Sequence, residues 1–246
     1  IGARIREKVK ARVAALPASP GLAVILVGDD PASHLYDELK KRACEEAGIR
    51  FELFLYPADV SEDALVLKIH ELNARPDVTG ILVQLPLPAQ DANRVIAAIR
   101  PEKDVDGFHP ESLRALAEGR PGIVSALALG IMKLVDEGRR VVAPLANRVV
   151  IVGSPLFAEP LRLLFSEQRA TIDRVDPSDP ELGTRTMSAD VLIVAVGKPG
   201  LIVGSMVKPG AIVIDVGTTK IGRRVIGDVD AETVLPVAGA LSPVPG

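Results

Sequence analysis

The sequence predicts an α/β protein with two α/β domains, the second a Rossmann-like, doubly wound parallel sheet. Short apolar runs rich in Val, Ile and Leu alternate along the chain with longer segments of helical periodicity. This alternation is typical of parallel sheets covered by helices. The chain has 246 residues, of which 48% are hydrophobic and only 3% aromatic. It can therefore bury one large core or two modest ones built from aliphatic side chains.

The first part of the chain carries the signals for three strands. Apolar runs at 22–27, 51–56 and 80–84 have the length of buried strands. Asp30 suits an N-cap, Pro31 a first helical position and Gly48 a helix end, which predicts a helix from Pro31 to Ala47. Its predicted core stripe is Ala32, Leu35, Leu39, Ala43 and Ala47. Other helices are expected at the amphipathic start of the chain, at about 61–72 and at 92–99.

A second series follows the Gly- and Pro-containing segment 119–122, which predicts a domain boundary. A connecting helix is expected over 125–135 and another helix over about 156–167. Strands are expected at 148–152, 170–175, 191–196 and 211–216. The predicted domains are residues 1–121 and 122–240, the second nucleotide-binding in style.

Composition argues against several classes of function. The formal net charge is −3 and the Lys and Arg residues are dispersed, so no basic stripe suits a nucleic-acid backbone. No apolar run reaches the ~18 residues of a membrane span. Cys44 is the only cysteine and only three His are present, so we expect no intramolecular disulfide and no metal site. Cys44 is expected to be a small buried residue, and a reducing, cytoplasmic setting fits a single thiol.

Four polar residues are placed to do chemistry. Tyr36 and Lys40 are four apart on one predicted helix and share a face. Gln84 ends a buried strand, where parallel sheets bind ligands, and Asp106 lies in a Gly-containing turn. A lysine is a good base at neutral pH only when burial or neighbouring charges lower its pKa. From these residues alone, a solvated helix face is the more common interpretation of a Tyr–Lys pair.

Several blocks of sequence closely resemble the bifunctional methylenetetrahydrofolate dehydrogenase/methenyltetrahydrofolate cyclohydrolase family. The most specific are Gly-Ile-Leu-Val-Gln-Leu-Pro-Leu-Pro at 80–88 and Lys-Asp-Val-Asp-Gly-Phe at 103–108. Others lie at 27–44, 195–200, 210–217 and 227–230, and in the closing Ser-Pro-Val-Pro-Gly. The blocks occur in the family's order and span essentially the whole chain.

The resemblance implies a role for each candidate. Lys40 would be the catalytic lysine, Gln84 the residue that tunes it, Tyr36 a residue lining the folate site, and Asp106 a hydrogen-bond partner of the pterin ring. Further substrate contacts would come from Val83, Leu85, Pro245 and Gly246. The segment from about 241 would return to the first, folate-binding domain. The implied partners are tetrahydrofolate derivatives and a second copy of the chain in a homodimer.

The second domain departs from the family pattern. Where the family has Gly-Arg-Ser-x-x-Val-Gly-x-Pro after the first strand, the chain has Gly153-Ser154-Pro155-Leu156-Phe157-Ala158-Glu159-Pro160, one residue shorter and without the arginine. The family's His-Ser-x-Thr is replaced by Asp176-Pro177-Ser178-Asp179. The expected cofactor contacts are Gly153, Ser154, Asp176 and Thr218.

These departures leave the cofactor open. The resemblance implies NADP, but an acid about 20 residues after the first glycine is typical of NAD sites and repels a 2′-phosphate. Either the protein prefers NAD or binds NADP poorly, or the second domain binds no dinucleotide.

The leading functional hypothesis is NAD(P)-dependent oxidation of methylenetetrahydrofolate followed by hydrolysis of methenyltetrahydrofolate to formyltetrahydrofolate, as part of one-carbon metabolism and purine biosynthesis. The alternatives are a homologue with cyclohydrolase activity only and a non-catalytic folate-binding homologue.

Overall fold

The structure is a computed structural model that describes residues 2–28, 31–142, 147–222 and 224–245, except for the side chains of residues 2–4 and 31–38. The chain divides into two compact units, residues 1–115 with 120–123 and residues 116–119 with 124–246. The predicted boundary at residues 121 and 122 falls in the segment where the chain passes between the units.

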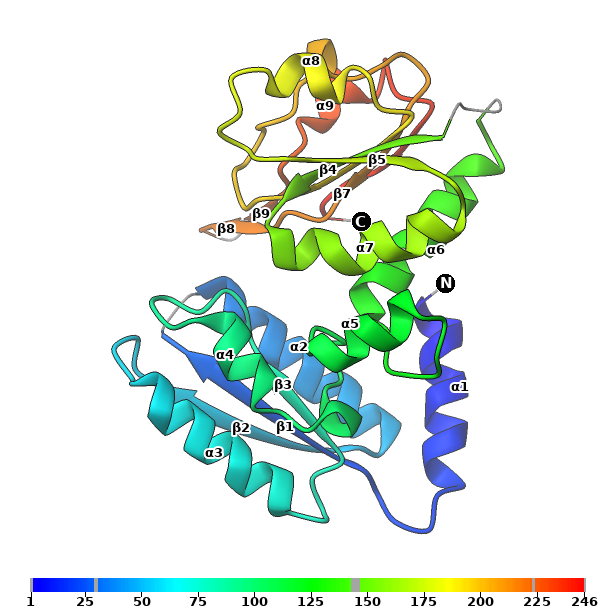
Figure 1. Ribbon diagram of the computed structural model, residues 1–246. Coiled ribbons are helices and arrows are strands. Elements are labelled where there is room, and N and C mark those ends of the chain that lie inside the picture. Colours follow the sequence, from blue (N-terminus) through cyan, green and yellow to red (C-terminus); the bar gives the residue numbers. More distant parts are fainter. Residues whose placement is uncertain (1, 29–30, 143–146, 223, 246) are drawn as a thin grey trace. The chain divides into compact units, whose positions relative to one another are not determined.

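The first unit is a three-layer arrangement around a parallel sheet with the strand order β2-β1-β3. Its strands are β1 Gly21–Val27, β2 Arg50–Tyr56 and β3 Gly80–Val83, and its helices are α1 Gly2–Ala14, α2 Pro31–Ala47, α3 Glu62–Ala74, α4 Ala92–Ala97, the 3₁₀ turn η1 Pro101–Lys103, and α5 Pro110–Ala117. Helices α2 and α3 lie on opposite faces of the sheet (Figure 1). Right-handed crossovers require this, because β2 and β3 pair with opposite edges of β1.

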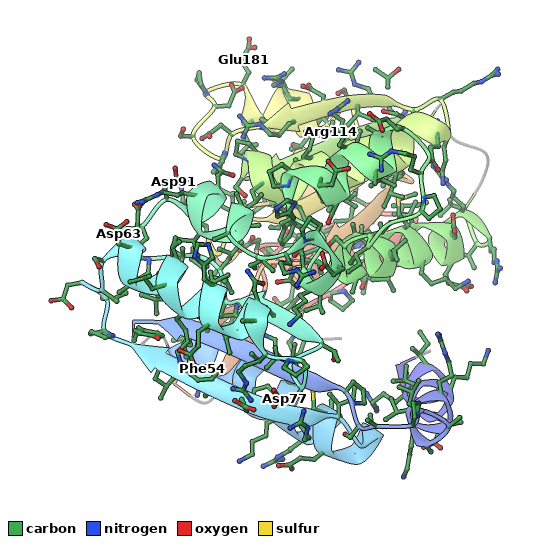
Figure 2. All side chains as sticks on the ribbon, turned by 60° about the horizontal axis from the view of Figure 1, so that its bottom comes forward. Phe54, Asp63, Asp77, Asp91, Arg114 and Glu181 are labelled. Atoms are coloured by element: carbon green, nitrogen blue, oxygen red, sulfur yellow. The ribbon has the colours of Figure 1, made fainter. Side chains whose placement is uncertain are left out.

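The core of the first unit lies between the sheet and the two helices α3 and α4. Leu65, Ile69 and Leu72 of α3 are fully buried against alternate residues of the strands. The two helices also begin together, because Arg94 of α4 pairs with both Glu62 and Asp63 at the start of α3. Asp63 and Asp91, labelled in Figure 2, mark these two helix starts.

The second unit is a doubly wound parallel sheet with the strand order β10-β7-β6-β4-β5. Its main elements are α6 Ala126–Arg139, β4 Arg148–Gly153, α7 Pro155–Glu167, β5 Thr171–Val175, α8 Leu182–Thr186, β6 Val191–Ala195, η2 Gly204–Met206, β7 Ile212–Asp215, the antiparallel pair β8 Thr219–Ile221 and β9 Arg224–Ile226, α9 Ala231–Val234, and β10 Ala240–Ser242. One core packs α6 and α7 against one face, and a second core packs α8 and α9 against the other.

The two units confirm the predicted fold class and most predicted elements. The helix α2 begins at Pro31 and ends at Ala47, as Pro31 and Gly48 indicated, although the predicted N-cap Asp30 lies outside the described residues. The predicted core stripe of α2 is wrong at Leu39 and Ala43, whereas Ala47 is partly buried. Leu39 and Ala43 are exposed, whereas Lys40 is partly buried and Cys44 is buried as expected. The face toward the sheet is thus displaced by one residue from the apolar pattern.

Candidate functional site

Gln84 is held at the carboxyl end of the first sheet by its own backbone. Its N–H donates to the carbonyl oxygen of Ile25 at 2.8 Å, which extends the β1–β3 ladder by one residue. Side chains alternate along a strand, so Val83 points into the core against α3 and Gln84 points toward the face covered by α2. The Gln84 amide Nε2 donates to the Leu85 carbonyl at 3.0 Å. This bond leaves the other end of the amide, Oε1, to accept a hydrogen bond.

Lys40 meets Gln84 across this face of the sheet. The Lys40 Nζ donates a hydrogen bond to Gln84 Oε1. Lys40 shares the inner face of α2 with the buried Cys44, four residues later. The amine therefore meets a neutral amide in this hydrogen bond, and its charge also interacts with the Asp106 carboxyl. Tyr36 is one turn earlier on α2, and its side chain lies outside the described residues.

The four side chains of the Lys-Asp-Val-Asp-Gly turn at 103–107 have different surroundings. Lys103 donates to the carbonyls of Asn73, in the last turn of α3, and of Arg75, its C-cap, each at 2.8 Å. Asp104 is buried and accepts from the backbone N–H of His109 and the hydroxyl of Ser112, which organises the start of α5. Lys103 and Asp104 are thus structural.

The other two side chains of this turn face the sheet and the site. Val105 packs so closely on Gly80 that a Cβ at position 80 would lie 2.5 Å from it. Asp106 is partly buried, and burial raises the pKa of its carboxyl to about 6. The positive charge of Lys40 opposes this rise in pKa, and Asp104 adds to it. The structure thus joins Lys40 to Gln84 by a hydrogen bond and brings Lys40 close enough to Asp106 for their charges to interact, with Val83 and Leu85 beside Gln84.

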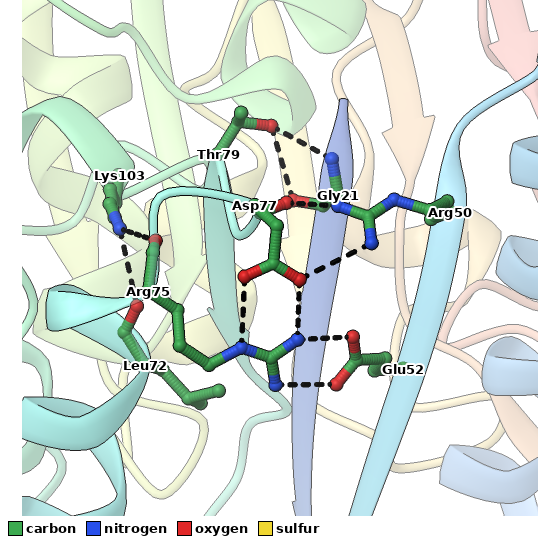
Figure 3. A network of polar contacts seen from close by, with 8 residues as sticks. All are labelled: Gly21, Arg50, Glu52, Leu72, Arg75, Asp77, Thr79 and Lys103. Atoms are coloured by element: carbon green, nitrogen blue, oxygen red, sulfur yellow. Dashed lines mark hydrogen bonds and ion pairs between the residues drawn. The ribbon is translucent and has the colours of Figure 1, made fainter. Parts of the chain in front are cut away.

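The densest ion-pair network of the first unit lies at the opposite edge of the sheet (Figure 3). Arg75 binds Glu52 with two nitrogens at 2.7 and 2.8 Å and Asp77 with two at 2.7 and 3.1 Å. These bonds raise the pKa of Arg75 and lower that of Asp77. Arg50 adds a further pair to Asp77 at 3.2 Å. The network surrounds the amino ends of the strands, where parallel sheets do not bind ligands, so its role is structural.

The predicted cofactor loop of the second unit lies at a topological switch point. In the strand order, β5 lies on one side of β4 and β6 on the other. Ligands of doubly wound sheets bind at the carboxyl ends of such strands. Gly153 ends β4 here, and a Cβ on it would lie 2.9 Å from the Phe157 ring and 3.1 Å from the Ala195 carbonyl oxygen. Any side chain at this position would therefore require the Phe157 ring to move.

The helix that follows offers few free amide donors. Pro155 has no N–H, and the N–H of Phe157 donates to the hydroxyl of Ser154, the N-cap, at 3.2 Å. Glu159 is one turn into α7 and pairs with Arg162 at 2.7 Å, so a neighbouring cation offsets its charge. The site therefore keeps the Rossmann shape but has lost donors that would face a diphosphate.

Asp176 and Thr218 lie at the same edge of the second sheet. Asp176 directly follows β5 and accepts from both the N–H and the hydroxyl of Ser178, at 3.0 and 2.6 Å. Thr218 follows β7, and its hydroxyl donates to the Val216 carbonyl at 3.4 Å.

The end of the chain carries two of the predicted substrate contacts. Pro245 is exposed, beyond the edge strand β10, and Gly246 lies outside the described residues. The return of this segment to the first unit stays a prediction.

Sequence reasoning missed two polar residues at this edge. Asp228 is fully buried and accepts from the N–H groups of Val196, Gly197 and Lys198, at 2.5, 3.0 and 2.7 Å. Arg174 on β5 donates to the Gly153 carbonyl oxygen at 3.0 Å. The available signals were an acid directly after Gly227 and an arginine one position before the end of the predicted strand 170–175.

Two features of other site classes are absent from the described part of the chain. No helix there has the length and apolar character needed to cross a membrane. No three His, Cys, Asp or Glu side chains gather there as a metal ion would require.

Comparison with known proteins accounts for both units. Residues 1–106 match the family model described as tetrahydrofolate dehydrogenase/cyclohydrolase, catalytic domain, and residues 125–246 match its NAD(P)-binding domain. The "Bifunctional protein FolD" of Bordetella bronchiseptica is 48% identical, over 99% of this chain and 87% of that protein.

Solved structures agree with these matches. The bifunctional FolD methylenetetrahydrofolate dehydrogenase/cyclohydrolase of Campylobacter jejuni superposes with a TM-score of 0.86 at 35% identity, and the FolD of Trypanosoma brucei, complexed with NADP cofactor and an inhibitor, with 0.88 at 32%. Each covers 99% of this chain and 88% of the relative. The chain therefore belongs to the tetrahydrofolate dehydrogenase/cyclohydrolase family, as its sequence blocks predicted.

Proposed function

We propose that this protein is a bifunctional enzyme that oxidises methylenetetrahydrofolate with a nicotinamide dinucleotide and hydrolyses the resulting methenyltetrahydrofolate to formyltetrahydrofolate. The observation that carries the proposal is the hydrogen bond from Lys40 to the neutral amide of Gln84 at the carboxyl edge of the first sheet. The similarity to FolD proteins extends through both units, which supports both activities.

Lys40 is the proton-transfer residue of the hydrolysis in this proposal. Water adds to the electrophilic one-carbon bridge, and a ring nitrogen must gain a proton as the bridge opens to the formyl group. A single amine that both accepts and returns a proton serves the two steps. Gln84 orients the amine through its carbonyl oxygen, and as a neutral partner it does not hold the ammonium form as strongly as a carboxylate would.

Asp106 is proposed to bind the pterin ring, whose ring and exocyclic N–H groups are hydrogen-bond donors. With its pKa near 6, the carboxyl is mostly ionised at neutral pH and accepts these hydrogens. Tyr36, Val83, Leu85, Pro245 and Gly246 are proposed to line the same folate site.

The second unit is proposed to bind the dinucleotide, which accepts the hydride when bound. Its residues fit such a group, because Gly153 is closely approached by the Phe157 ring and the Ala195 carbonyl and lies at the switch point. Gly153, Ser154, Asp176 and Thr218 are the proposed contacts. The Trypanosoma brucei relative holds NADP, which favours NADP over NAD as the cofactor.

A second candidate is hydrolysis without oxidation. It is favoured by the start of α7, where Pro155 has no N–H and Ser154 occupies the N–H of Phe157. A non-catalytic folate-binding role is disfavoured by the retained contact between Lys40 and Gln84.

The experiment supplies purified protein with methenyltetrahydrofolate and follows loss of its chromophore, then supplies methylenetetrahydrofolate with NADP or NAD and follows the reduced cofactor. Both reactions are expected. Hydrolysis that Lys40→Ala abolishes, without any reduced cofactor from wild-type protein, would establish the second candidate. Absence of both activities and of folate binding would refute both of the proposed enzymatic functions.

The proposal includes an oligomeric state and a location, namely a homodimer in the cytoplasm. The family resemblance supports the dimer, and the single buried thiol of Cys44 suits a reducing compartment. Light scattering of the purified protein tests the dimer directly.

A further inference from the structure

Arg174 lies where the adenosine half of a dinucleotide is expected. It pairs with Ile151 in the β4–β5 register, and Val175 pairs with Val152, so Asp176 comes level with Gly153. Arg174 and Asp176 are two residues apart at the end of a strand, and their side chains start on the same side of the sheet. One nitrogen of the Arg174 guanidinium reaches the Gly153 carbonyl oxygen at 3.0 Å. The guanidinium therefore lies beside the loop that opens α7.

The charges of two cations act on the acid at this edge. Asp176 is fixed by the hydroxyl and N–H of Ser178, and these bonds are the largest cause of its lowered pKa. The charges of Arg174 on β5 and Lys198 after β6 lower it further, which places both near the carboxylate. The three side chains together carry one net positive charge. Asp176 alone would repel a phosphate, and this group of three would not.

Arg174 also offers the donors that the α7 loop lacks. Two residues of the first turn of that helix offer no free backbone N–H to a phosphate. Pro155 has none, and that of Phe157 donates to Ser154. A guanidinium presents five N–H donors in a fork that matches phosphate oxygens. One of these N–H groups of Arg174 donates to the Gly153 carbonyl oxygen.

We propose that Arg174, assisted by Lys198, binds the 2′-phosphate of an adenosine dinucleotide and so allows this chain to use NADP despite Asp176. The inference rests on the dehydrogenase half of the proposed function and specifies its cofactor. An acid after the second strand holds the adenosine ribose, and an arginine beside it accommodates a 2′-phosphate. In this chain the arginine comes from β5, two residues before the acid. Arg174 is thus a specificity-determining residue.

The test compares two probes that differ only in the 2′-phosphate, adenosine 2′,5′-bisphosphate and adenosine 5′-monophosphate, by calorimetry on the full chain. NADPH and NADH, followed by their own fluorescence, repeat the comparison. Wild-type protein is expected to bind the bisphosphate and NADPH more tightly. Arg174→Gln should weaken binding of these two by about 10- to 100-fold and change the other two by less than about twofold.

Three further variants sharpen the result. Arg174→Lys should retain part of the affinity for the bisphosphate, because it keeps the charge and loses the fork. Asp176→Asn should raise that affinity. The matched control is Arg140→Gln, which alters an exposed arginine paired with Glu137 at the end of α6, and it should leave all four affinities unchanged.

Two outcomes overturn the inference alone. Equal losses for both adenosine probes in Arg174→Gln would assign the residue to the phosphates that the probes share. Unchanged affinities would remove Arg174 from the site. Failure of wild-type protein to bind NAD, NADP or either probe, with hydrolysis of methenyltetrahydrofolate intact, would instead refute the dehydrogenase half of the proposed function and the inference with it.

Discussion

Each of the two sheets has a topological switch point, but different groups lie at the two points. In each, the strand that follows the first lies on one side of it and the third lies on the other. At the first switch point Lys40 bonds Gln84, and the charge of Lys40 acts on the desolvated carboxyl of Asp106. At the second, backbone amides surround the fully buried Asp228. A site that moves protons needs side chains whose charge can change, and a site that positions a bound group needs a fixed backbone.

Lys40→Ala is the strongest test of the first half of this comparison. Loss of a proton-transfer group is expected to lower kcat for methenyltetrahydrofolate hydrolysis by about 10²- to 10⁴-fold, with the melting temperature little changed. The neighbouring Lys41 is exposed on the same helix, so Lys41→Ala is the matched control and should retain full activity. Equal losses in both variants would show that α2 contributes only general charge.

Asp228→Ala tests the second half. The variant leaves the N–H groups of Val196, Gly197 and Lys198 without their acceptor, at an expected cost of about 2–5 kcal/mol in the free energy of unfolding. Chemical denaturation measures it. Asp230→Ala removes the partly buried N-cap of the short helix α9 and should cost no more than about 1 kcal/mol. A cost for Asp228→Ala as small as that of the control would contradict its role as anchor of the loop.

Gln84→Glu places a carboxylate where Lys40 now meets an amide. The ammonium form of the lysine is then held in an ion pair, and hydrolysis should slow by about 10- to 100-fold without loss of stability. The pH–rate profile should shift toward higher pH. Gln90→Glu changes a glutamine that bonds the carbonyls of Ala58 and Val60 instead, and its rate should match wild type. A fully active Gln84→Glu would show that the neutrality of the partner is unimportant.

Asp106→Asn has the smallest expected effect, and its sign depends on pH. The folded-state pKa, about 6, lies above the ordinary value of 3.8. The stability that this group contributes is therefore fully present below about pH 4 and lost as pH rises through about 6. The variant should be more stable than wild type by about 1–3 kcal/mol at pH 8 and nearly equal to it at pH 4. Denaturation at both values checks this, and an equal gain at both would exclude titration as its cause.

Much of the fold could be predicted because short signals are local. Pro31 and Gly48 bracket α2, and Ser61 and Ser125 cap α3 and α6, through contacts within a few residues. The inner face of α2 could not be predicted, since Leu39 and Lys40 are neighbours and only tertiary packing decides which of them turns inward. Helix α5 was also missed, because Asp104 organises its start from outside the helix.

The site divides in the same way. Lys40, Gln84 and Asp106 could be proposed from sequence blocks, although their convergence depends on the register of β1 with β3. Arg174 and Asp228 could not, because their partners Gly153 and Val196 lie 21 and 32 residues away. The local patterns single out both residues, but neither pattern identifies the distant partner.

The five residues from Lys103 to Gly107 have a consequence for inhibition. Lys103 closes α3, Asp104 starts α5, Val105 fills the space above Gly80, and Asp106 faces the site. A compound that binds the Asp106 carboxyl would approach a stretch in which neighbouring substitutions also damage the scaffold. Drug resistance through substitution of Lys103, Asp104 or Val105 would therefore carry a cost in folding.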